Sequence, residues 1–502
     1  MIRANLISNY FGQAVIALLN IAFVPIYIRY LGIENYGIIG LFTLLTACLS
    51  VFEVSISNAL MREMARRYEI SATEVRRSIK DLLRTVELAS VVIAVILGFG
   101  IILSSNWMAS YWLKTNNLSG TALKNAIICM GVLIALRFME GIYRSAIIGM
   151  QKQVVLNYIS IILAAIRSLG GVLVLSWNSG SVLPFLVWQG VASIIGTMSF
   201  LVYVYWCLRN EKIKGKFSYQ ELINIRRFAG GLFLIAVLSV ALTQYDKILL
   251  SSRLSLEAYG AYSIAVTISG LLFVLIGPIT QAYYPRYCQL IQKDNQEELI
   301  RQFHNGSQLI SLLVGSIAII LMFNSKIILE IWTGNIELAE KAAPIVCAIT
   351  IGNLINGFMQ IPYQMQLAHG WTGLTVRVNS IAIFISIPLT SYLIEIYGEE
   401  GGAWGWALIN LLLIIINMSI MYSKILIDQG WVWLYRDIII PMFIGCTFAS
   451  VFRYIYNEYN INNIYMNITY IIISYILVTT FILIGSRNIR QYSNKFLKNA
   501  KN

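Results

Sequence analysis

Residues 88–103 read Leu-Ala-Ser-Val-Val-Ile-Ala-Val-Ile-Leu-Gly-Phe-Gly-Ile-Ile-Leu, and this stretch decides the fold class. It is apolar on every face of a helix and lacks the polar alternation of a barrel strand. The longer apolar run that contains it, 82–106, is long enough to cross a hydrocarbon core about 30 Å thick. The stretch therefore predicts a membrane-spanning α-helix.

Runs of this kind recur along the whole chain. Of its 502 residues, 58% are hydrophobic and 12% are charged, which is more apolar surface than a soluble domain of this length can bury. We predict an all-α polytopic membrane protein with about 14 transmembrane helices. The runs cover 9–30, 36–60, 82–106, 123–148, 154–176, 182–208, 229–251, 259–284, 307–329, 342–367, 374–397, 402–427, 437–456 and 467–486.

Lys and Arg set the expected orientation, because short loops rich in these residues stay in the cytoplasm. Most of the 37 Lys and Arg residues lie in the termini and in the loops after even-numbered spans. We therefore expect a multi-pass protein of the cytoplasmic (inner) membrane with both termini in the cytoplasm. The first run lacks a small-residue cleavage site, so we expect it to be retained. The net charge of +13 gathers beside the membrane, where it meets anionic lipid, so we expect no nucleic-acid partner.

An internal repeat divides the chain. Residues 31–37 read Leu-Gly-Ile-Glu-Asn-Tyr-Gly and residues 254–260 read Leu-Ser-Leu-Glu-Ala-Tyr-Gly, with Leu, Glu, Tyr and Gly in register. An even number of spans separates the copies, which predicts two parallel-repeat six-helix bundles with the substrate path between them. The predicted domains are an N-terminal lobe at 1–208, a cytoplasmic inter-lobe linker at 209–228, a C-terminal lobe at 229–427, and two additional helices with a basic cytoplasmic tail at 428–502.

Span 4 carries Arg137, Glu140 and Arg144 at i, i+3 and i+7 on one helix face, and span 5 adds Arg167 at mid-depth. An ionisable residue at the bilayer centre costs about 2.5 to 3.5 kcal/mol, so it persists where it is paired, hydrated or functional. Three arginines against one glutamate leave the lobe positive, and the arginine fork suits phosphate oxygens. We predict that these four residues bind an anionic head group. The alternative is that Glu140 neutralises one arginine and the others snorkel to an interface.

Three further charged residues within spans are assigned to coupling or gating. Glu53 in span 2 is either a second acid that takes a proton during the cycle or a structural partner of an arginine. Asp246 and Lys247 in span 7 point about 100° apart on a helix, so at least one of them needs a partner elsewhere. Asp246 is a candidate coupling-ion or inter-lobe lock residue.

Span 10 carries an amide stripe. Its residues are spaced three and four apart, which places them along one face of the helix. We predict that this face binds the hydroxyl groups of a glycan, and the alternative is that the amides hold neighbouring helices together. The residues are Asn353, Asn356, Gln360 and Gln364.

Two segments resemble a known family. Residues 246–265, Asp-Lys-Ile-Leu-Leu-Ser-Ser-Arg-Leu-Ser-Leu-Glu-Ala-Tyr-Gly-Ala-Tyr-Ser-Ile-Ala, resemble the span 7 to 8 signature of bacterial polysaccharide (O-antigen-type) flippases. Residues 30–37, Tyr-Leu-Gly-Ile-Glu-Asn-Tyr-Gly, resemble their span 1 to 2 signature. These flippases belong to the multidrug/oligosaccharidyl-lipid/polysaccharide exporter superfamily, and the resemblance in span count, loop lengths and order extends along essentially the whole chain.

The resemblance implies a flippase. Such a protein turns an undecaprenyl-pyrophosphate-linked oligosaccharide repeat unit from the inner to the outer leaflet, for O-antigen or capsule biosynthesis, by ion-coupled alternating access. The implied partners are this lipid-linked oligosaccharide, membrane lipid, and a polysaccharide polymerase with its chain-length proteins.

Two other functions compete with this one. A multidrug exporter of the same superfamily would share the fold but carry an acid-rich cavity, which the intramembrane arginines disfavour. A membrane-embedded polysaccharide polymerase or glycosyltransferase needs a sizeable outer loop, and the longest here, near 107–122 and 330–341, are short. With His304 in an inner loop, His369 after span 10 and no metal-ligand spacing, we expect neither an enzyme nor a catalytic residue, metal or cofactor.

Overall fold

The computed structural model describes residues 2–68, 73–116, 118–178, 180–209, 215–458 and 463–485. All the regular elements in these ranges are helices, and the one β-type pairing among the described residues is an isolated bridge between Lys114 and Ser255. The all-α prediction is therefore confirmed for the described chain. Part of the predicted linker, 210–214, and the basic tail from residue 486 lie outside these ranges.

Twelve helices within the described ranges are long and apolar enough to span a membrane. Two of the long helices, α2 (Val24–Arg67) and α12 (Thr372–Met421), contain a glycine with positive φ, Gly32 at 77° and Gly398 at 57°. A left-handed residue interrupts a right-handed helix, and glycine adopts that conformation without strain. The part of α2 before Gly32 continues α1 (Ile2–Ala22), and Gly398 divides α12, so each break adds one crossing. The total agrees with the number of apolar runs in the sequence.

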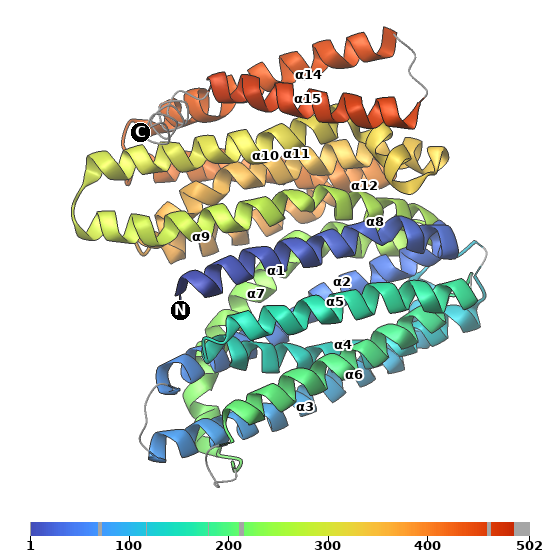
Figure 1. Cartoon of the computed structure of the whole chain (residues 1–502), viewed down its shortest axis with the longest axis vertical. Coiled ribbons are helices and arrows are strands. Elements are labelled where there is room, and N and C mark those ends of the chain that lie inside the picture. The colour runs from blue at the N-terminus through green and yellow to red at the C-terminus, as the bar shows by residue number, and fades with distance from the viewer. Residues whose placement is uncertain are drawn as a thin grey trace. The chain divides into compact units, whose positions relative to one another are not determined.

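The first compact unit extends to Gly260. At its centre α4 packs against α2, α3 and α6, while α5 packs against α1 and α6, and α7 lies along α2 (Figure 1). The bounds of its remaining elements are α3 (Thr73–Trp107), the π-helical turn η1 (Met108–Trp112), α4 (Gly120–Gly149), α5 (Gln153–Trp177), α6 (Val182–Cys207), α7 (Tyr219–Arg253) and the start of α8 (Leu256–Ser269).

Apolar packing fixes the rotation of α4 about its axis. Ile142 and Ala146 on α4 are fully buried in one cluster with Leu82 of α3, Leu60 of α2 and Phe200 of α6. Burying a side chain of this size stabilises the fold by about 1.5 to 3 kcal/mol where water or a polar cavity is the alternative. With these side chains held, the polar face of α4 is directed to α5 and α6.

The second compact unit begins at Ala261. At its centre α11 packs against α9, α10 and α12, and the paired helices α14 and α15 both pack against α10 (Figure 1). The bounds of its further elements are α9 (Leu271–Gln292), α10 (Gln296–Thr333), α11 (Ile336–Ala368), α13 (Gln429–Val432), the π-helical segment η2 (Trp433–Ile439), α14 (Ile440–Glu458) and α15 (Ile464–Gly485).

The two central helices are equivalent under the sequence repeat. α4 is span 4 and α11 is span 10, six spans later, and each lies at the centre of its own unit. The lobe boundaries at 209–228 and 427, which rest on the repeat alone, stay a prediction.

Candidate functional site

The predicted head-group residues meet in the first unit around Glu140. This carboxylate is 4% exposed on the inward face of α4. Arg167 of α5 donates a hydrogen bond from Nη2 to Glu140 Oε2 at 2.5 Å, and Arg144, one turn along α4, places Nη1 3.7 Å from Oε1. We call Arg137, Glu140, Arg144 and Arg167 the arginine cluster.

The arginines of the cluster differ in how firmly they are held. Arg167 is fixed by Glu140 and donates a second hydrogen bond to Ser193 Oγ at 3.4 Å. Arg144 is held by the longer contact with Glu140 and remains 43% exposed, with its guanidinium 5.9 Å from the ring centroid of Phe200. Arg144 is therefore the arginine that can turn to a ligand with the least rearrangement.

Arg137 lies over an aromatic ring. Its guanidinium carbon is 4.7 Å from the ring centroid of Phe42 of α2, and its Nη2 donates to Gln189 Oε1 of α6 at 3.5 Å. The buried Nε atoms of Arg137 and Arg167 have no hydrogen-bond acceptor among the described residues. Two unpaired donors beside one carboxylate leave the cluster able to bind additional acceptor oxygens.

Gln189 and Ser193 are site residues that the sequence analysis missed. Both lie on α6, four residues apart, and Gln189 also donates from Nε2 to the backbone oxygen of Arg167 at 3.4 Å. Thr197 continues the same face and donates to Leu136 O at 3.4 Å. The signal was present as three polar residues at four-residue spacing in an otherwise apolar span.

Glu53 joins the cluster from α2. Its carboxylate rests directly on Gly141 of α4, where even a single methyl group would overlap Glu53 Oε1. The acid interacts electrostatically with Arg144, Glu140 and Arg137. The structure thus brings Glu53 to the head-group residues, and Gly141 is the residue that makes room for it.

Asp246 and Lys247 pair with each other on α7. Lys247 Nζ lies 3.2 Å from Asp246 Oδ1 and donates to the backbone oxygen of Thr243 at 2.8 Å. Lys247 also interacts electrostatically with Cys48 of α2, which places it on the face of α7 that packs against α2. The sequence predicted a partner elsewhere for at least one of the two residues; the structure pairs them with each other, and Lys247 in addition donates to the Thr243 carbonyl.

The amide stripe lies on α11 in the second unit, and half of it is engaged with neighbouring helices. Asn353 donates to Ser269 O at 3.0 Å and accepts from Trp406 Nε1 at 2.9 Å. Asn356 donates to Asn410 Oδ1 at 2.8 Å and accepts from Gln360 Nε2 at 2.9 Å. The fourth member, Gln364, is half-buried. Asn353 and Asn356 thus hold helices together, whereas Gln360 and Gln364 retain exposed surface.

A second polar network was missed entirely, because His304 was expected in a loop. The structure places His304 inside α10, where its Nδ1 lies 2.5 Å from Asp437 Oδ2 of η2 and its Nε2 lies 3.1 Å from Gln429 Oε1. Gln308 Nε2 donates to Asp437 Oδ1 at 2.7 Å, and Ser311 Oγ donates to the backbone oxygen of Asp437 at 2.5 Å. This network fastens the segment that leads into α14 to the second unit.

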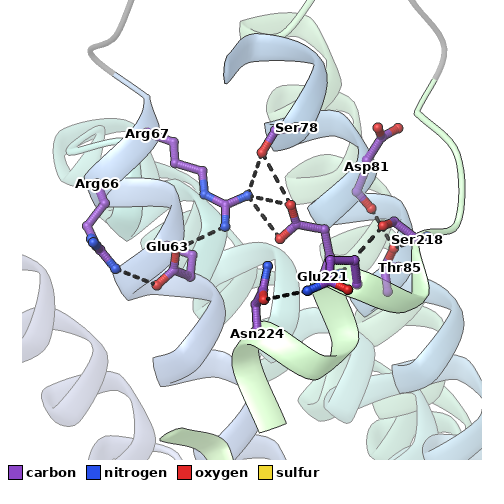
Figure 2. Close-up of polar contacts among 10 residues, drawn as sticks. Glu63, Arg66, Arg67, Ser78, Asp81, Thr85, Ser218, Glu221 and Asn224 are labelled. Atoms are coloured by element: carbon purple, nitrogen blue, oxygen red, sulfur yellow. Dashed lines mark hydrogen bonds and ion pairs between the residues drawn. The ribbon is translucent and has the colours of Figure 1, made fainter. Parts of the chain in front are cut away.

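A third network joins α2, α3 and α7 at one end of the first unit, as Figure 2 shows. Arg67 Nη1 donates to both carboxylate oxygens of Glu221 at 2.9 and 3.0 Å and to Ser78 Oγ at 2.6 Å, while its Nη2 donates to Glu63 at 3.1 Å. Ser218 caps α7 by accepting from the backbone N–H of Glu221 at 3.4 Å. The start of α7 is therefore tied to α2 and α3.

Replacing Glu221 with alanine is expected to lower the free energy of unfolding by about 1.5 to 3 kcal/mol, because hydrogen bonds between charged groups contribute that much when partly buried. Thermal unfolding of the purified protein in detergent measures the change. Arg66→Ala is the control, since Arg66 is 65% exposed and pairs with the same Glu63 at the surface. Equal effects of the two substitutions would contradict a special role for the Arg67 network.

Two family models match parts of the chain, and one curated relative matches most of its length. A family model described as polysaccharide biosynthesis protein matches residues 2–291, and a model described as MatE matches residues 232–392. A Shigella flexneri protein named "Putative O-antigen transporter" is 22% identical over 425 residues, which cover 84% of this chain and 97% of that protein.

Solved structures share the fold. The lipid II flippase MurJ in an inward closed conformation matches with a TM-score of 0.69 at 13% identity, over 95% of this chain and 98% of its own. An inward-facing multidrug resistance transporter of the MATE family matches with a TM-score of 0.66 at 12% identity, over 83% of this chain and 98% of its own. At these identities the likeness concerns the fold alone.

Proposed function

We propose a transport function from the premise that this chain belongs to the polysaccharide biosynthesis protein family. It is a multi-pass membrane protein whose described helices share the fold of flippases and multidrug transporters. We infer that it moves an undecaprenyl-pyrophosphate-linked oligosaccharide repeat unit from the inner to the outer leaflet of the cytoplasmic membrane. The name of the Shigella flexneri relative and the fold of the lipid II flippase support this substrate class.

The observation that carries the proposal is the arginine cluster. Three arginines lie within the spans around one buried carboxylate, with unpaired donors on Arg137 and Arg167 and a loosely held, partly exposed Arg144. A pyrophosphate offers several acceptor oxygens and matches both the positive charge and the fork geometry. In this proposal Arg144 contacts the phosphate first, and Glu140 keeps Arg167 oriented until the substrate arrives.

The remaining predicted residues have narrower proposed roles. The exposed part of the amide stripe, Gln360 and Gln364, is the part proposed to face the glycan, while Asn353 and Asn356 hold the stripe in place. Glu53 is the proposed coupling acid, because it interacts electrostatically with Arg144, Glu140 and Arg137, so protonating it would change the net charge of the arginine cluster's surroundings. The Asp246–Lys247 pair, on the helix that lies along α2, is proposed as a gating element.

The charge pattern completes the proposal. The termini and the loops after even-numbered spans together carry most of the Lys and Arg residues, which favours cytoplasmic termini in the inner membrane. A polysaccharide polymerase and its chain-length proteins are then the proposed neighbours, since they act on the product in the outer leaflet. Deleting the gene should abolish the surface polysaccharide and accumulate lipid-linked repeat units in the inner leaflet.

Replacing Arg137, Arg144 and Arg167 singly with Gln is expected to lower export about tenfold to a hundredfold, because each loses a charge-assisted hydrogen bond of about 1.5 to 3 kcal/mol to the substrate. Export of the surface polysaccharide is measured at matched protein levels. Arg301→Gln, on the exposed side of α10, is the control and should export normally. Unchanged export in all three cluster variants would remove the basis for an anionic substrate.

A multidrug exporter is the second candidate, favoured by the MatE match at residues 232–392 and by the MATE transporter fold. It predicts resistance to cationic dyes that depends on this gene. The surplus of arginine in the first unit repels such cations, so we expect dye efflux to be the same with and without the protein.

A further inference from the structure

Two glycines of the first unit bring helix backbones into direct contact. A side chain on Gly37 of α2 would overlap the backbone oxygen of Leu256, and the Cβ of any residue at Gly260 of α8 would lie 2.5 Å from the backbone oxygen of Ile33. Real Cβ atoms essentially never approach an oxygen so closely. The two helix ends can therefore touch only because both positions are glycine.

The two contacts are equivalent under the sequence repeat. In the alignment of 31–37 with 254–260, Gly37 corresponds to Gly260 and Ile33 corresponds to Leu256. Each repeat glycine thus packs on the carbonyl four residues before the other glycine. The contact is reciprocal, and it unites the two segments that the repeat marks as the junctions of spans 1 and 2 and of spans 7 and 8.

The loop between η1 and α4 reinforces this contact. Leu256 N donates to Lys114 O at 2.8 Å, and Lys114 forms the isolated parallel bridge with Ser255. Two residues further along the same loop, the backbone N–H of Asn116 donates to Glu34 Oε1 at 2.7 Å. One short loop therefore binds both copies of the repeat at the same end of the bundle.

We propose that this reciprocal glycine contact is the gate that closes the outer end of the transport path. The inference rests on the proposed transport function and on the orientation that the charge pattern predicts, which places Lys114 and Ser255 outside. Glu53, the proposed coupling acid, lies about 24 Å of helix beyond Gly37 on α2. Lys247, from the proposed gating pair, lies on α7, which ends at Arg253 shortly before Ser255. Opening the gate separates the two backbones, and closure requires the glycines to meet again.

Replacing either glycine with alanine tests the gate, because the substitution should prevent the gate from closing. In Gly37→Ala and Gly260→Ala the added methyl meets a backbone oxygen that cannot turn aside, so the closed state is disfavoured about tenfold or more. Gly100→Ala in α3 is the matched control, because nothing lies within 4 Å of a Cβ there. The reporter is Cys48, about 16 Å further along α2 on the side facing Lys247, with the other cysteines replaced by serine.

Labelling of Cys48 by a membrane-impermeant maleimide added outside the cell should rise in both glycine variants and stay low in Gly100→Ala. Export should fall in the same two variants. Low labelling in folded Gly37→Ala and Gly260→Ala protein would overturn the gate.

A disulfide tests the same gate in the opposite direction, without touching the glycines. The backbones of two residues paired in a β-bridge, as Lys114 and Ser255 are, lie about 4.8 Å apart, which is within the range that a disulfide spans. Lys114→Cys combined with Ser255→Cys should therefore crosslink. The oxidised protein should stop exporting and recover when a reductant is added, and each single variant should export normally. Export by the fully crosslinked protein would also overturn the gate, even if the glycine variants fail to fold.

The two proposals fail separately. If gene deletion leaves the surface polysaccharide intact but Cys48 labelling responds to the glycines and the disulfide, the gate stands and the proposed substrate is wrong. If deletion abolishes the polysaccharide but neither the glycine variants nor the disulfide changes Cys48 labelling, the proposed substrate is supported and the glycine contact is not the gate.

Discussion

Replacing Asp437 with alanine is expected to cost the protein about 3 to 5 kcal/mol of stability, because the change breaks a buried pair and leaves its partners uncompensated. Asp437 is fully buried and accepts from Gln308 while it contacts His304 Nδ1 at 2.5 Å. Thermal unfolding in detergent and protein level in the membrane report the loss. We expect α14 and α15 to become accessible to protease before the first unit unfolds.

The control for this prediction is Glu337→Ala, because Glu337 is 77% exposed and its removal should change stability by less than about 0.5 kcal/mol. His304→Ala combined with Asp437→Ala completes a double-mutant cycle. Since the two side chains are in direct contact, their combined effect should be smaller than the sum of the single effects. Additive losses would show that the dyad does not hold the terminal helices.

Glu140→Gln is expected to have the largest effect on the first unit. The substitution leaves Arg167 and Arg144 without the carboxylate that both contact, so stability should fall by about 3 kcal/mol or more. Export should fall as well, because Arg167 loses the partner that orients it. Both quantities are measured on the same preparation, with exposed Glu297→Gln as the control.

The double variant Glu140→Gln with Arg167→Gln separates structure from function. Replacing a whole buried pair by neutral groups of similar size is often nearly neutral, so the double variant should regain most of the stability. Its export should stay at least about tenfold low, because Arg167 no longer offers a charge to the phosphate. Normal export in the stable double variant would confine the pair to a structural role.

The sequence predicted the helices and the membrane environment because apolar runs of this length and number cannot all be buried in a soluble domain. It also predicted the shared face of Arg137, Glu140 and Arg144, since three- and four-residue spacing places side chains on one side of any helix. The breaks at Gly32 and Gly398 were covered by treating the segments around them as separate spans. These features depend only on local geometry.

Partners supplied by distant helices could not be predicted in this way. The contacts of Arg137 with Gln189 and of His304 with Asp437 join residues 52 and 133 positions apart, and they depend on how each helix is rotated in the packed unit. The amide stripe also shows that residue spacing does not predict contacts between helices. Its spacing was read correctly, but only packing decides that Asn353 and Asn356 bond to Ser269 and Asn410.

The reciprocal contact of Gly37 and Gly260 has the form of an isologous interface, in which residue i of one subunit meets residue j of its twin and the reverse. Here one polypeptide holds both sides. When two copies of a unit are joined in one chain, the residues of each copy can be substituted independently of those in the other. The central helices display that freedom, because Arg137, Glu140 and Arg144 on α4 and Asn353, Asn356 and Gln360 on α11 share the i, i+3, i+7 spacing but differ in charge. A homodimer would have to carry the same charges in both of its subunits, whereas the fused chain carries cations in its first unit and neutral amides in its second.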